Sequence, residues 1–569
     1  MIEDALQYDA DRTLTADVCV IGAGAAGITL ALELAGRGVD VLLVESGGHK
    51  PDDRTQRLYE GAVADERMHS PPHRYRQRRF GGSTTIWGGR CMPFDEIDFE
   101  SRPYVGHSGW PIDRAALLPF YARANQLCEA GRFEYRAGEA FNRPLRPIID
   151  GFDSQYFTID GLERFSCPTD FGARYEHRLR ASPRIRVLLN ANLTDIRLNA
   201  AGTAVESLIL RTFSQRCITV RASRVVLAMG ALEIPRVLLA SRSVQSHGIG
   251  NQHDNVGRYY MCHVAGTIGT LIQEGNVDRV WHGYDISDEG IYCRRRFQLN
   301  ERTQRRLQLG NFIGRLHHPR ITDPAHRSAV LSALQLAKGM ISYEYGKRLH
   351  GEQKLSASSW LAHLRNVVLG PHQVIAFGHH MLRDRFLATR KFPSIIVRSP
   401  AGRYSLDFHG EQEPLASSRI TLDGTRDEFD MPRLLVDWHY SELDVRTVRE
   451  SVRLFAEDIA RCKIGRFDYD PASVELEMTR FGAYGGHHLG TARMGDDPRA
   501  SVVDRDCRVH DVHNLYLAGG AVFPTSSQAN PTLTIVALAT RLAAHLQAES
   551  ARQRTAVADG LEAIAAART

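Results

Sequence analysis

Residues 17–27 of this 569-residue chain read Asp-Val-Cys-Val-Ile-Gly-Ala-Gly-Ala-Ala-Gly, and this stretch decides the fold. It starts with an apolar run of buried-strand length and continues with glycines in the spacing G-x-G-x-x-G. In such a motif Gly22 allows a tight turn, Gly24 lets the backbone approach a pyrophosphate, and Gly27 lets a helix pack closely on the strand. The amides at the helix N-terminus then face the phosphate charge.

The residues after the glycines complete a βαβ unit. A helical pattern continues to Arg37, and a second apolar run covers residues 39–44 and ends at Glu45. Glu45 follows roughly twenty residues after the glycines, where a carboxylate can accept hydrogen bonds from a ribose diol. The order of these parts predicts an α/β protein with a Rossmann-like, doubly wound sheet that binds a dinucleotide. The motif alone does not choose between FAD and NAD.

Composition limits the size and the partners of the protein. A chain of 569 residues with 43% hydrophobic residues is too long for one compact core and long enough for two domains. The formal charge of +5 is small for this length and does not argue for nucleic acid. Two basic runs, 74–79 and 294–296, are interpreted as solvated loop or strand faces, with contact to phosphates or an acidic substrate as the alternative.

The cysteines and the N-terminus bear on the cellular compartment. The nine cysteines are scattered and include no C-x-x-C pair, which predicts reduced thiols rather than a disulfide framework or a zinc site. Residues 1–18 are acidic and lack an apolar core, and no apolar run is long enough to span a bilayer. We therefore expect a soluble cytoplasmic protein without a membrane span.

A glycine-rich segment follows at residues 81–90, Gly-Gly-Ser-Thr-Thr-Ile-Trp-Gly-Gly-Arg. This composition favours neither helix nor strand, but it lets the backbone lie flat against a ligand. The predicted cofactor contacts in it are Gly82, Ser83, Trp87 and Gly88. A flexible surface loop is the alternative, which the large apolar side chain of Trp87 disfavours. Further on, Asp113 is the expected N-cap of a helix over residues 114–128.

Short strands in meander order are predicted between residues 185 and 228. They cover residues 187–189, 193–198, 205–211, 217–221 and 224–228. The last strand ends at Gly230 and Ala231, before a helix that starts at Glu233. Because ligands bind at the carboxyl ends of strands in a doubly wound sheet, Gly230 and Ala231 are candidate contacts of the same dinucleotide, as is Leu193.

The pattern changes between about residues 255 and 482. Strands such as 418–422 and 434–438 alternate with helices such as 327–338 and 442–462, which predicts an inserted α+β domain that covers the cofactor. The pairs His317-His318 and His379-His380 fall in this region. No carboxylate or cysteine lies at ligand spacing from them, so they are interpreted as structural or surface residues and no metal site is predicted.

The C-terminal part of the chain carries the candidate chemistry. Residues 486–495, Gly-His-His-Leu-Gly-Thr-Ala-Arg-Met-Gly, place two imidazoles beside a glycine turn. Residues 514–533 add an apolar run, a second Gly-Gly turn and Asn530-Pro531-Thr532. The last three residues open a predicted helix over 531–546, with Asn530 as N-cap and proline in the first turn.

Six motifs resemble, in this order, the glucose–methanol–choline (GMC) family of flavoprotein oxidoreductases. They are the glycine motif at 22–27, GGSTTIWGG, GWPI, the Gly230-Ala231 turn, HHLGTARMG and LYLAGGAVFPTSSQANPTL. The resemblance implies FAD, an alcohol substrate and hydride transfer to flavin N5. It also implies two interleaved domains. The FAD-binding domain is expected to comprise residues 1–105, 183–262 and 482–569, and the substrate-binding domain residues 106–182 and 263–481.

The motif style is nearest to the pyranose oxidase-like and sugar dehydrogenase branch of the family, so the resemblance implies a sugar or polyol substrate. In that branch a histidine just before the tryptophan of the second motif can bind the flavin covalently. Here this position is Ile86, and noncovalent FAD is therefore expected.

The resemblance also assigns roles to residues of the C-terminal motifs. His487 holds the family's His-x-x-Gly-Thr position and is the expected base, because a neutral imidazole can take a hydroxyl proton near pH 7; His488 is the alternative. Asn530 is expected to hold the substrate oxygen. Further expected cofactor contacts are Gly519, Gly520, Ala521, Pro531 and Thr532, the last two at a helix N-terminus whose dipole stabilises anionic reduced flavin.

Two other function classes stay open from the sequence. A flavoprotein of the same fold could catalyse elimination or isomerisation, and a binding protein could retain the fold without catalysis, although His487 and Asn530 disfavour the latter. The sequence does not distinguish oxygen, a quinone or a redox protein as electron acceptor, and it does not reveal the oligomeric state.

Overall fold

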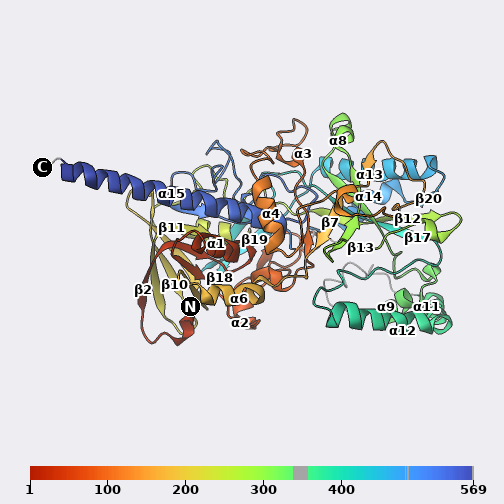
Figure 1. Ribbon diagram of the computed structural model, residues 1–569, viewed down its shortest axis with the longest axis horizontal. Helices are drawn as coiled ribbons and strands as arrows, with labels where there is room; N and C mark the ends of the chain where they lie inside the picture. Colours follow the sequence, from red (N-terminus) through yellow and green to blue (C-terminus); the bar gives the residue numbers. More distant parts are fainter. Residues whose placement is uncertain (338–355, 481, 484–485, 567–569) are drawn as a thin grey trace.

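The computed structural model describes residues 1–337, 356–480, 482–483 and 486–566. An eight-stranded sheet forms one end of the molecule (Figure 1), with the strand order β1-β8-β3-β2-β11-β10-β9 and with β21 paired to β11. The strands are β1 (Ile2–Asp4), β2 (Arg12–Ile21), β3 (Val41–Val44), β8 (Ile185–Leu189), β9 (Asn192–Leu198), β10 (Val205–Arg211), β11 (Cys217–Leu227) and β21 (Leu515–Leu517). The β9–β10 and β10–β11 pairings are antiparallel, and the other pairings are parallel. The sheet therefore joins N-terminal, central and C-terminal segments.

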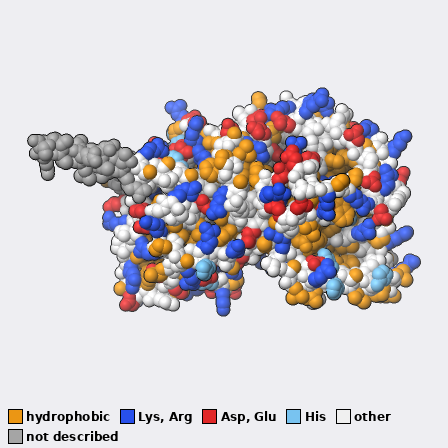
Figure 2. Space-filling model, in the orientation of Figure 1, with side chains coloured by type: hydrophobic (Ala, Val, Ile, Leu, Met, Phe, Trp, Pro, Cys, Tyr) orange, Lys and Arg blue, Asp and Glu red, His pale blue; other side chains and the backbone are white. Residues whose placement is uncertain are grey.

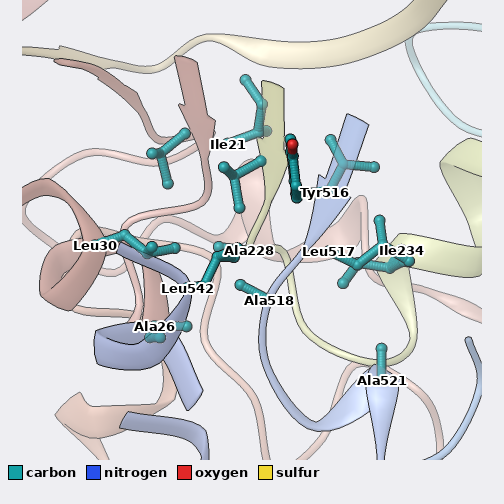
Figure 3. Packing of buried hydrophobic residues seen from close by; sticks show 14 of the residues in the cluster. Ile21, Ala26, Leu30, Ala228, Ile234, Tyr516, Leu517, Ala518, Ala521 and Leu542 are labelled. Atoms are coloured by element: carbon teal, nitrogen blue, oxygen red, sulfur yellow. The ribbon is translucent and has the colours of Figure 1, made fainter. Parts of the chain in front are cut away.

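Helices cover the parallel part of this sheet, as its apolar strands require. Helix α1 (Ala25–Ala35) follows β2 and packs against α15 (Thr532–Ala566) near the other end of the sequence. Figure 3 shows Ile21, Leu30, Ala228, Leu517 and Leu542 gathered in the core between these elements. The predicted α/β fold class with an FAD-binding Rossmann-like sheet is confirmed.

Three predicted boundaries differ from the structure. Residues 217–227 form the single strand β11, not two strands, because its parallel pairing with β2 continues through Ala222. Helix α4 (Leu118–Leu127) begins four residues after the predicted start at residue 114. The Asp113 carboxylate accepts a hydrogen bond from the backbone amide of Ala116 at 2.8 Å and therefore caps a turn, not the helix. Helix α15 continues past residue 546, and its far end extends away from the body of the molecule in Figure 1.

Two predicted helices of the central region are present. The helix predicted over 442–462 is α13 (Glu442–Arg461), whose N-cap Ser441 forms a capping box with Asp444. The helix predicted over 327–338 is α9 (Ala329–Leu336), which begins after the N-cap Ser328; Lys338 lies outside the described residues.

A six-stranded sheet at the other end of the molecule has the order β20-β12-β17-β16-β15-β6. The strands are β6 (Phe157–Thr158), β12 (Val264–Gln273), β15 (Phe297–Leu299), β16 (Phe312–His317), β17 (Arg403–Gly410) and β20 (Gly465–Asp468). Alternate side chains of β17 belong to opposite faces. Leu406 and Phe408 pack in the hydrophobic core with α13, whereas Asp407 has Thr267 of β12 and Arg315 of β16 as cross-strand neighbours on the other face. One face of this sheet is therefore apolar and the other polar.

Two small sheets connect segments that lie on both sides of the predicted domain boundaries. One has the order β18-β19-β4, with β4 (Gly61–Val63), β18 (Arg419–Arg426) and β19 (Pro432–Asp437). The other has the order β13-β14-β7-β5, with β5 (Arg90–Cys91), β7 (Leu162–Phe165), β13 (Asp285–Ile286) and β14 (Tyr292–Arg295). The predicted domain boundaries themselves remain a prediction.

The surface and the thiols add two observations. In Figure 2 hydrophobic side chains gather where α11 (Ala357–Leu369) and α12 (Pro371–His380) lie, and they include Val368, Leu369 and Ile375, which are 66%, 69% and 73% exposed. Among the described residues, no helix is both long and apolar enough to cross a membrane. All nine cysteines are free thiols.

Candidate active site

A cavity of about 740 Å³ is lined by residues from both large sheets. This volume lies within the range of about 300–1,000 Å³ that is common for ligand sites. The predicted site residues that line it are Gly22, Gly24, Glu45, Gly82, Ser83, Trp87, Gly88, Leu193, Gly230, Ala231, His487, Gly519, Gly520, Asn530, Pro531 and Thr532. The structure therefore brings predicted residues from the whole length of the chain to one cavity.

The glycine turn between β2 and α1 forms one wall of the cavity. A Cβ atom at Gly22 would lie 2.6 Å from the carbonyl oxygen of Ala228, and one at Gly27 would lie 1.8 Å from that of Gly22. At Gly24 the same test meets no protein atom within 4 Å, so this backbone is open to a ligand. Helix α1 also has no side-chain cap, which leaves the amides of its first turn available to a ligand.

Two predicted residues, Gly27 and Ala521, do not line the cavity. Gly27 lies directly behind the turn, where its missing side chain permits the packing of α1. Ala521 is fully buried, and its carbonyl oxygen accepts the amide of Ala492 at 2.8 Å. Glu45 reaches the cavity, but its carboxylate already accepts the amides of Ala23 at 2.8 Å and Gly47 at 3.0 Å. It therefore also holds the glycine turn in place.

The two predicted catalytic residues are in contact. The amide Nδ2 of Asn530 donates to Nε2 of His487 at 3.1 Å, with the amide assigned in that orientation. The Oδ1 atom of Asn530 is buried and has no hydrogen-bond partner among the described residues. The predicted N-cap role of Asn530 is therefore wrong, because a capping oxygen would accept an amide of α15. The side chain is instead oriented by its contact with His487.

A third residue, His263, supports this pair and was not predicted from the sequence. Its Nδ1 lies 2.8 Å from Nδ1 of His487, and its ring is fully buried. Burial lowers the pKa of His263 to about 4, so the ring is neutral near pH 7. His263 immediately precedes β12, and the six-stranded sheet therefore places it against the C-terminal motif.

His488 points into a different polar cluster. The hydroxyl of Tyr260 lies 2.6 Å from Nδ1 of His488, 2.8 Å from Nε2 of His69 and 3.2 Å from Sγ of Cys262. The three potential metal ligands of this cluster lie within 4.8 Å of one another, but the tyrosine hydroxyl occupies the space between them. Burial lowers the pKa of His488 well below its ordinary value. The cluster therefore fixes His488, while His487 faces Asn530.

The sequence comparisons agree with this geometry. Residues 17–335 match the family described as FAD dependent oxidoreductase, and residues 414–539 match the family described as GMC oxidoreductase. The chain is an FAD-dependent oxidoreductase of the GMC family. The resemblance seen in the motifs is thereby confirmed.

Several curated proteins and solved structures are similar to this GMC oxidoreductase along almost its whole length. The 6'''-hydroxyparomomycin C oxidase of Streptomyces lividus is 24% identical and the match covers 94% of this chain and 92% of that protein. The fructose dehydrogenase large subunit of Gluconobacter japonicus is also 24% identical, covering 94% and 98%. The structure of pyridoxine 4-oxidase from Mesorbium loti has a TM-score of 0.55 at 18% identity, covering 93% of this chain and 99% of that one, and it supports the fold alone.

The residues of this GMC oxidoreductase fit an FAD molecule. The open backbone at Gly24 and the uncapped start of α1 suit the pyrophosphate, and Gly82 closes against them, since a Cβ there would lie 2.9 Å from Cα of Gly24. Trp87 is held by a hydrogen bond from Nε1 to the carbonyl oxygen of Thr169 at 2.9 Å, while Ile86 before it is 41% exposed and lines the cavity.

The interpretation of the basic runs as solvated faces is wrong for four of their arginines. Arg76 and Arg78 are each 7% exposed and form ion pairs with the buried Glu233 at 3.0 and 3.2 Å. Arg294 and Arg296 are 3% and 4% exposed. All of these except Arg296 line the cavity. Burial of arginine depends on carboxylates or carbonyls that lie far away in the sequence, and a run of basic residues gives no signal for them.

The histidine pairs of the central region have different environments. His317 and His318 line the cavity, and Nδ1 of His318 lies 2.9 Å from the carbonyl oxygen of Pro319. Of the two alternatives predicted for this pair, the structural one fits His318, which is 5% exposed, and the surface one is wrong for it. His379 is exposed on α12, and Nδ1 of His380 contacts Asp384 at 2.6 Å, as expected for surface residues.

Proposed function

We propose that this GMC oxidoreductase oxidises an alcohol to a carbonyl compound with His487 as the base. The observation that carries the proposal is the contact of 3.1 Å between Nε2 of His487 and Nδ2 of Asn530, at a cavity whose other end fits a dinucleotide. When bound, FAD supplies the hydride acceptor at N5. The part of the protein is to bind the alcohol, orient its hydroxyl group and remove the hydroxyl proton.

The proton is taken at Nε2 of His487. Nδ1 of this ring lies 2.8 Å from Nδ1 of His263, so one of the two nitrogens carries the shared hydrogen. The amide of Asn530 donates to Nε2 of His487, which leaves the lone pair of His487 at Nε2 and its hydrogen at Nδ1. His263 then accepts that hydrogen, and a hydrogen bond of this kind fixes the tautomer of the base. His263 is therefore a positioning residue.

Asn530 orients the substrate in this proposal. Its Nδ2 faces the base, and its Oδ1 has no hydrogen-bond partner among the described residues. A buried carbonyl oxygen without a partner is unfavourable by about 1–3 kcal/mol. Rotation of the Asn530 side chain, which lines the cavity, lets a second hydroxyl group of a polyol donate to Oδ1 and remove that penalty. The hydroxyl group to be oxidised then replaces the amide of Asn530 as the donor to the lone pair of His487 Nε2.

We propose a sugar or polyol as substrate. The polar face of the six-stranded sheet presents Thr267, Ser405 and Asp407 to the cavity, and these groups can donate to and accept from several hydroxyl groups. The similarity to a fructose dehydrogenase subunit supports the same class. We also propose dissociable FAD, because Ile86 provides no nucleophile at the position of the covalent link, and we expect acid precipitation to release all flavin into the supernatant.

Anaerobic titration of the purified protein with sugars, polyols, aliphatic alcohols and aryl alcohols tests the proposal. We expect a sugar or polyol to bleach the flavin absorbance, and the rate of its return in air distinguishes oxygen from a dedicated acceptor. His487→Ala is expected to lower turnover by about 100- to 10,000-fold with FAD retained, since a positioned base contributes that much. His379→Ala, on the exposed surface of α12, is the control. Near-normal turnover of His487→Ala would move the base elsewhere.

A further inference from the structure

The charged residues that line the cavity are unevenly distributed. Near the glycine turn, Arg76 and Arg78 are balanced by Glu45 and Glu233. On the side of the six-stranded and four-stranded sheets the lining contains five arginines and two carboxylates, an excess of three positive charges. We call these arginines the arginine wall: Arg90, Arg294, Arg320, Arg385 and Arg480.

Arg294 is the most buried member of the arginine wall. It lies on β14 and is 3% exposed. Its Nη2 donates to the carbonyl oxygen of Leu316 at 2.6 Å, and its guanidinium carbon lies 5.7 Å from the ring centre of Tyr284. No carboxylate in the described part of the chain forms an ion pair with it. Neither Nε nor Nη1 of Arg294 forms a hydrogen bond in the described part of the chain, and Arg294 is among the residues that line the cavity.

The nearest carboxylates are already engaged by another arginine. Arg315 contacts Glu163 at 2.5 Å and Asp407 at 3.3 Å, and Nε of Arg90 lies 3.6 Å from Glu163. Burial lowers the pKa of Arg294, since these shared carboxylates do not compensate its desolvation. Arg236 is the contrasting case, because its pKa is raised by Glu233 and Asp427 despite the same burial. A buried guanidinium without a carboxylate partner is unfavourable unless a ligand supplies an anion.

The other members of the arginine wall repeat this surplus. Arg320 and Arg480 share one carboxylate, that of Glu477, at 2.9 and 2.7 Å. Arg385 donates from Nη1 to the carbonyl oxygens of Phe392 and Pro393, with no ion pair among the described residues. The planar guanidinium group matches carboxylate, phosphate and sulfate oxygens with two parallel hydrogen bonds.

We propose that the cavity binds an anionic alcohol, a sugar or polyol that carries a carboxylate, phosphate or sulfate group, with that group held by Arg294. This inference rests on the proposed alcohol oxidation, but the anion site can be tested without it. The anion accepts hydrogen bonds from the guanidinium donors of Arg294 that have no partner in the described part of the chain, while the hydroxyl group to be oxidised lies at His487 and Asn530. Cationic alcohols are expected to be poor substrates.

The first experiment measures anion binding alone. The flavin absorbance of the wild-type holoenzyme is titrated with sodium acetate and with sodium sulfate at constant ionic strength, and with acetamide as the neutral analogue of acetate. We expect a saturable spectral change with an anion and none with acetamide. Arg294→Gln is expected to weaken anion binding about 10- to 100-fold, since hydrogen bonds to charged groups contribute that much. Absence of a saturable change with either anion in the wild type would overturn the proposal.

Two variants control this measurement. Arg295→Gln changes the next residue of β14, which does not line the cavity and instead contacts Asp285 at 3.4 Å, so anion binding should be unchanged. Arg294→Lys keeps the positive charge and should retain part of the affinity for the anion. It provides the comparison with wild type even if Arg294→Gln does not bind flavin and therefore gives no absorbance signal. Equal weakening in Arg294→Gln and Arg295→Gln would contradict a specific site.

The second experiment uses substrate pairs that differ in charge. Rates of anaerobic flavin bleaching are compared for glucose, glucuronate and glucosamine, and for glycerol and glycerol 3-phosphate. We expect kcat/KM to be about tenfold or more higher for the anionic substrate of each pair than for the neutral one. Arg294→Gln should remove this preference while changing kcat/KM for the neutral substrate less than about twofold. If no alcohol bleaches the flavin but acetate binding depends on Arg294, the proposed oxidation fails and the anion site stands. Bleaching without charge preference, together with acetate binding that Arg294→Gln leaves intact, would leave the oxidation standing and refute the site.

Discussion

Glu233 offers a quantitative test of how the cavity wall is stabilised. This carboxylate is 2% exposed and receives three guanidinium groups, those of Arg76, Arg78 and Arg236, at 3.0, 3.2 and 3.2 Å. Burial alone would raise its pKa, but the attraction of the three arginines outweighs burial and lowers the pKa from 4.5 to about 2. At ~1.36 kcal/mol per pH unit, this difference corresponds to about 3 kcal/mol. Removal of one partner of a buried ion pair typically destabilises by about 3–5 kcal/mol.

We therefore expect Glu233→Gln to lower the free energy of unfolding by about 3 kcal/mol at pH 7. Urea unfolding followed by tryptophan fluorescence measures it, with the m-value as a check that the same transition is compared. The control is Glu428→Gln, which removes an ion pair of similar length, 2.7 Å to Arg54, between side chains that are 41% and 48% exposed. Exposed pairs contribute only about 0–1 kcal/mol.

The pH dependence gives the sign of the effect. Because the folded-state pKa of Glu233 is depressed, its stabilisation is fully present above the unfolded pKa near 4.5 and is lost as the pH falls towards about 2. The difference in stability between wild type and Glu233→Gln should thus be constant from pH 7 to pH 5 and shrink at lower pH. A destabilisation equal to that of Glu428→Gln, or a difference that grows on acidification, would refute the reasoning.

Two further predictions concern the base and the glycine turn. His263→Phe should reduce kcat about tenfold with little change in KM, because the ring proposed to accept Nδ1–H of His487 is lost. His263→Asn should restore part of the activity, because its amide oxygen can accept the same hydrogen. Steady-state kinetics of both variants measures these effects, and an unchanged kcat in His263→Phe would contradict the assigned role. Gly24→Ala should leave the circular dichroism spectrum intact but lower the flavin content, whereas Gly27→Ala should disturb folding itself, since its Cβ would lie 1.8 Å from the carbonyl oxygen of Gly22. Equal behaviour of the two glycine variants would contradict the assigned division of roles.

The parts of the site that the sequence predicted depend on short-range sterics or on motifs. Gly22, Gly24 and Gly27 were predictable because a turn between a buried strand and a helix needs glycine at that spacing. His487 and Asn530 were predictable only through the family resemblance, since 43 residues separate them and neither has a local signal that names its partner.

The missed residues depend on which strands pair. In β17 the alternation of Tyr404, Leu406 and Phe408 with polar residues indicates a half-buried strand, but not whether its polar face meets water or a cavity. That question is decided by β12, which pairs with β17 across more than one hundred residues of sequence. Likewise, the burial of Arg76 is decided by Glu233, 157 residues away. Such contacts leave no trace in a single sequence.

The contact between His263 and His487 links the segments that belong to the two large sheets. The proposed base His487 belongs to the segment that leads into β21 of the eight-stranded sheet, but His263, whose ring is proposed to fix its tautomer, immediately precedes β12 of the six-stranded sheet. The same polar sheet face then continues through Thr267 and Asp407 towards the arginine wall. A change that shifts β12 relative to the C-terminal motif therefore alters the orientation of the base and the substrate surface together. In the proposed mechanism, proton removal and substrate selection are therefore coupled, because β12 positions both His263 and part of the polar cavity face.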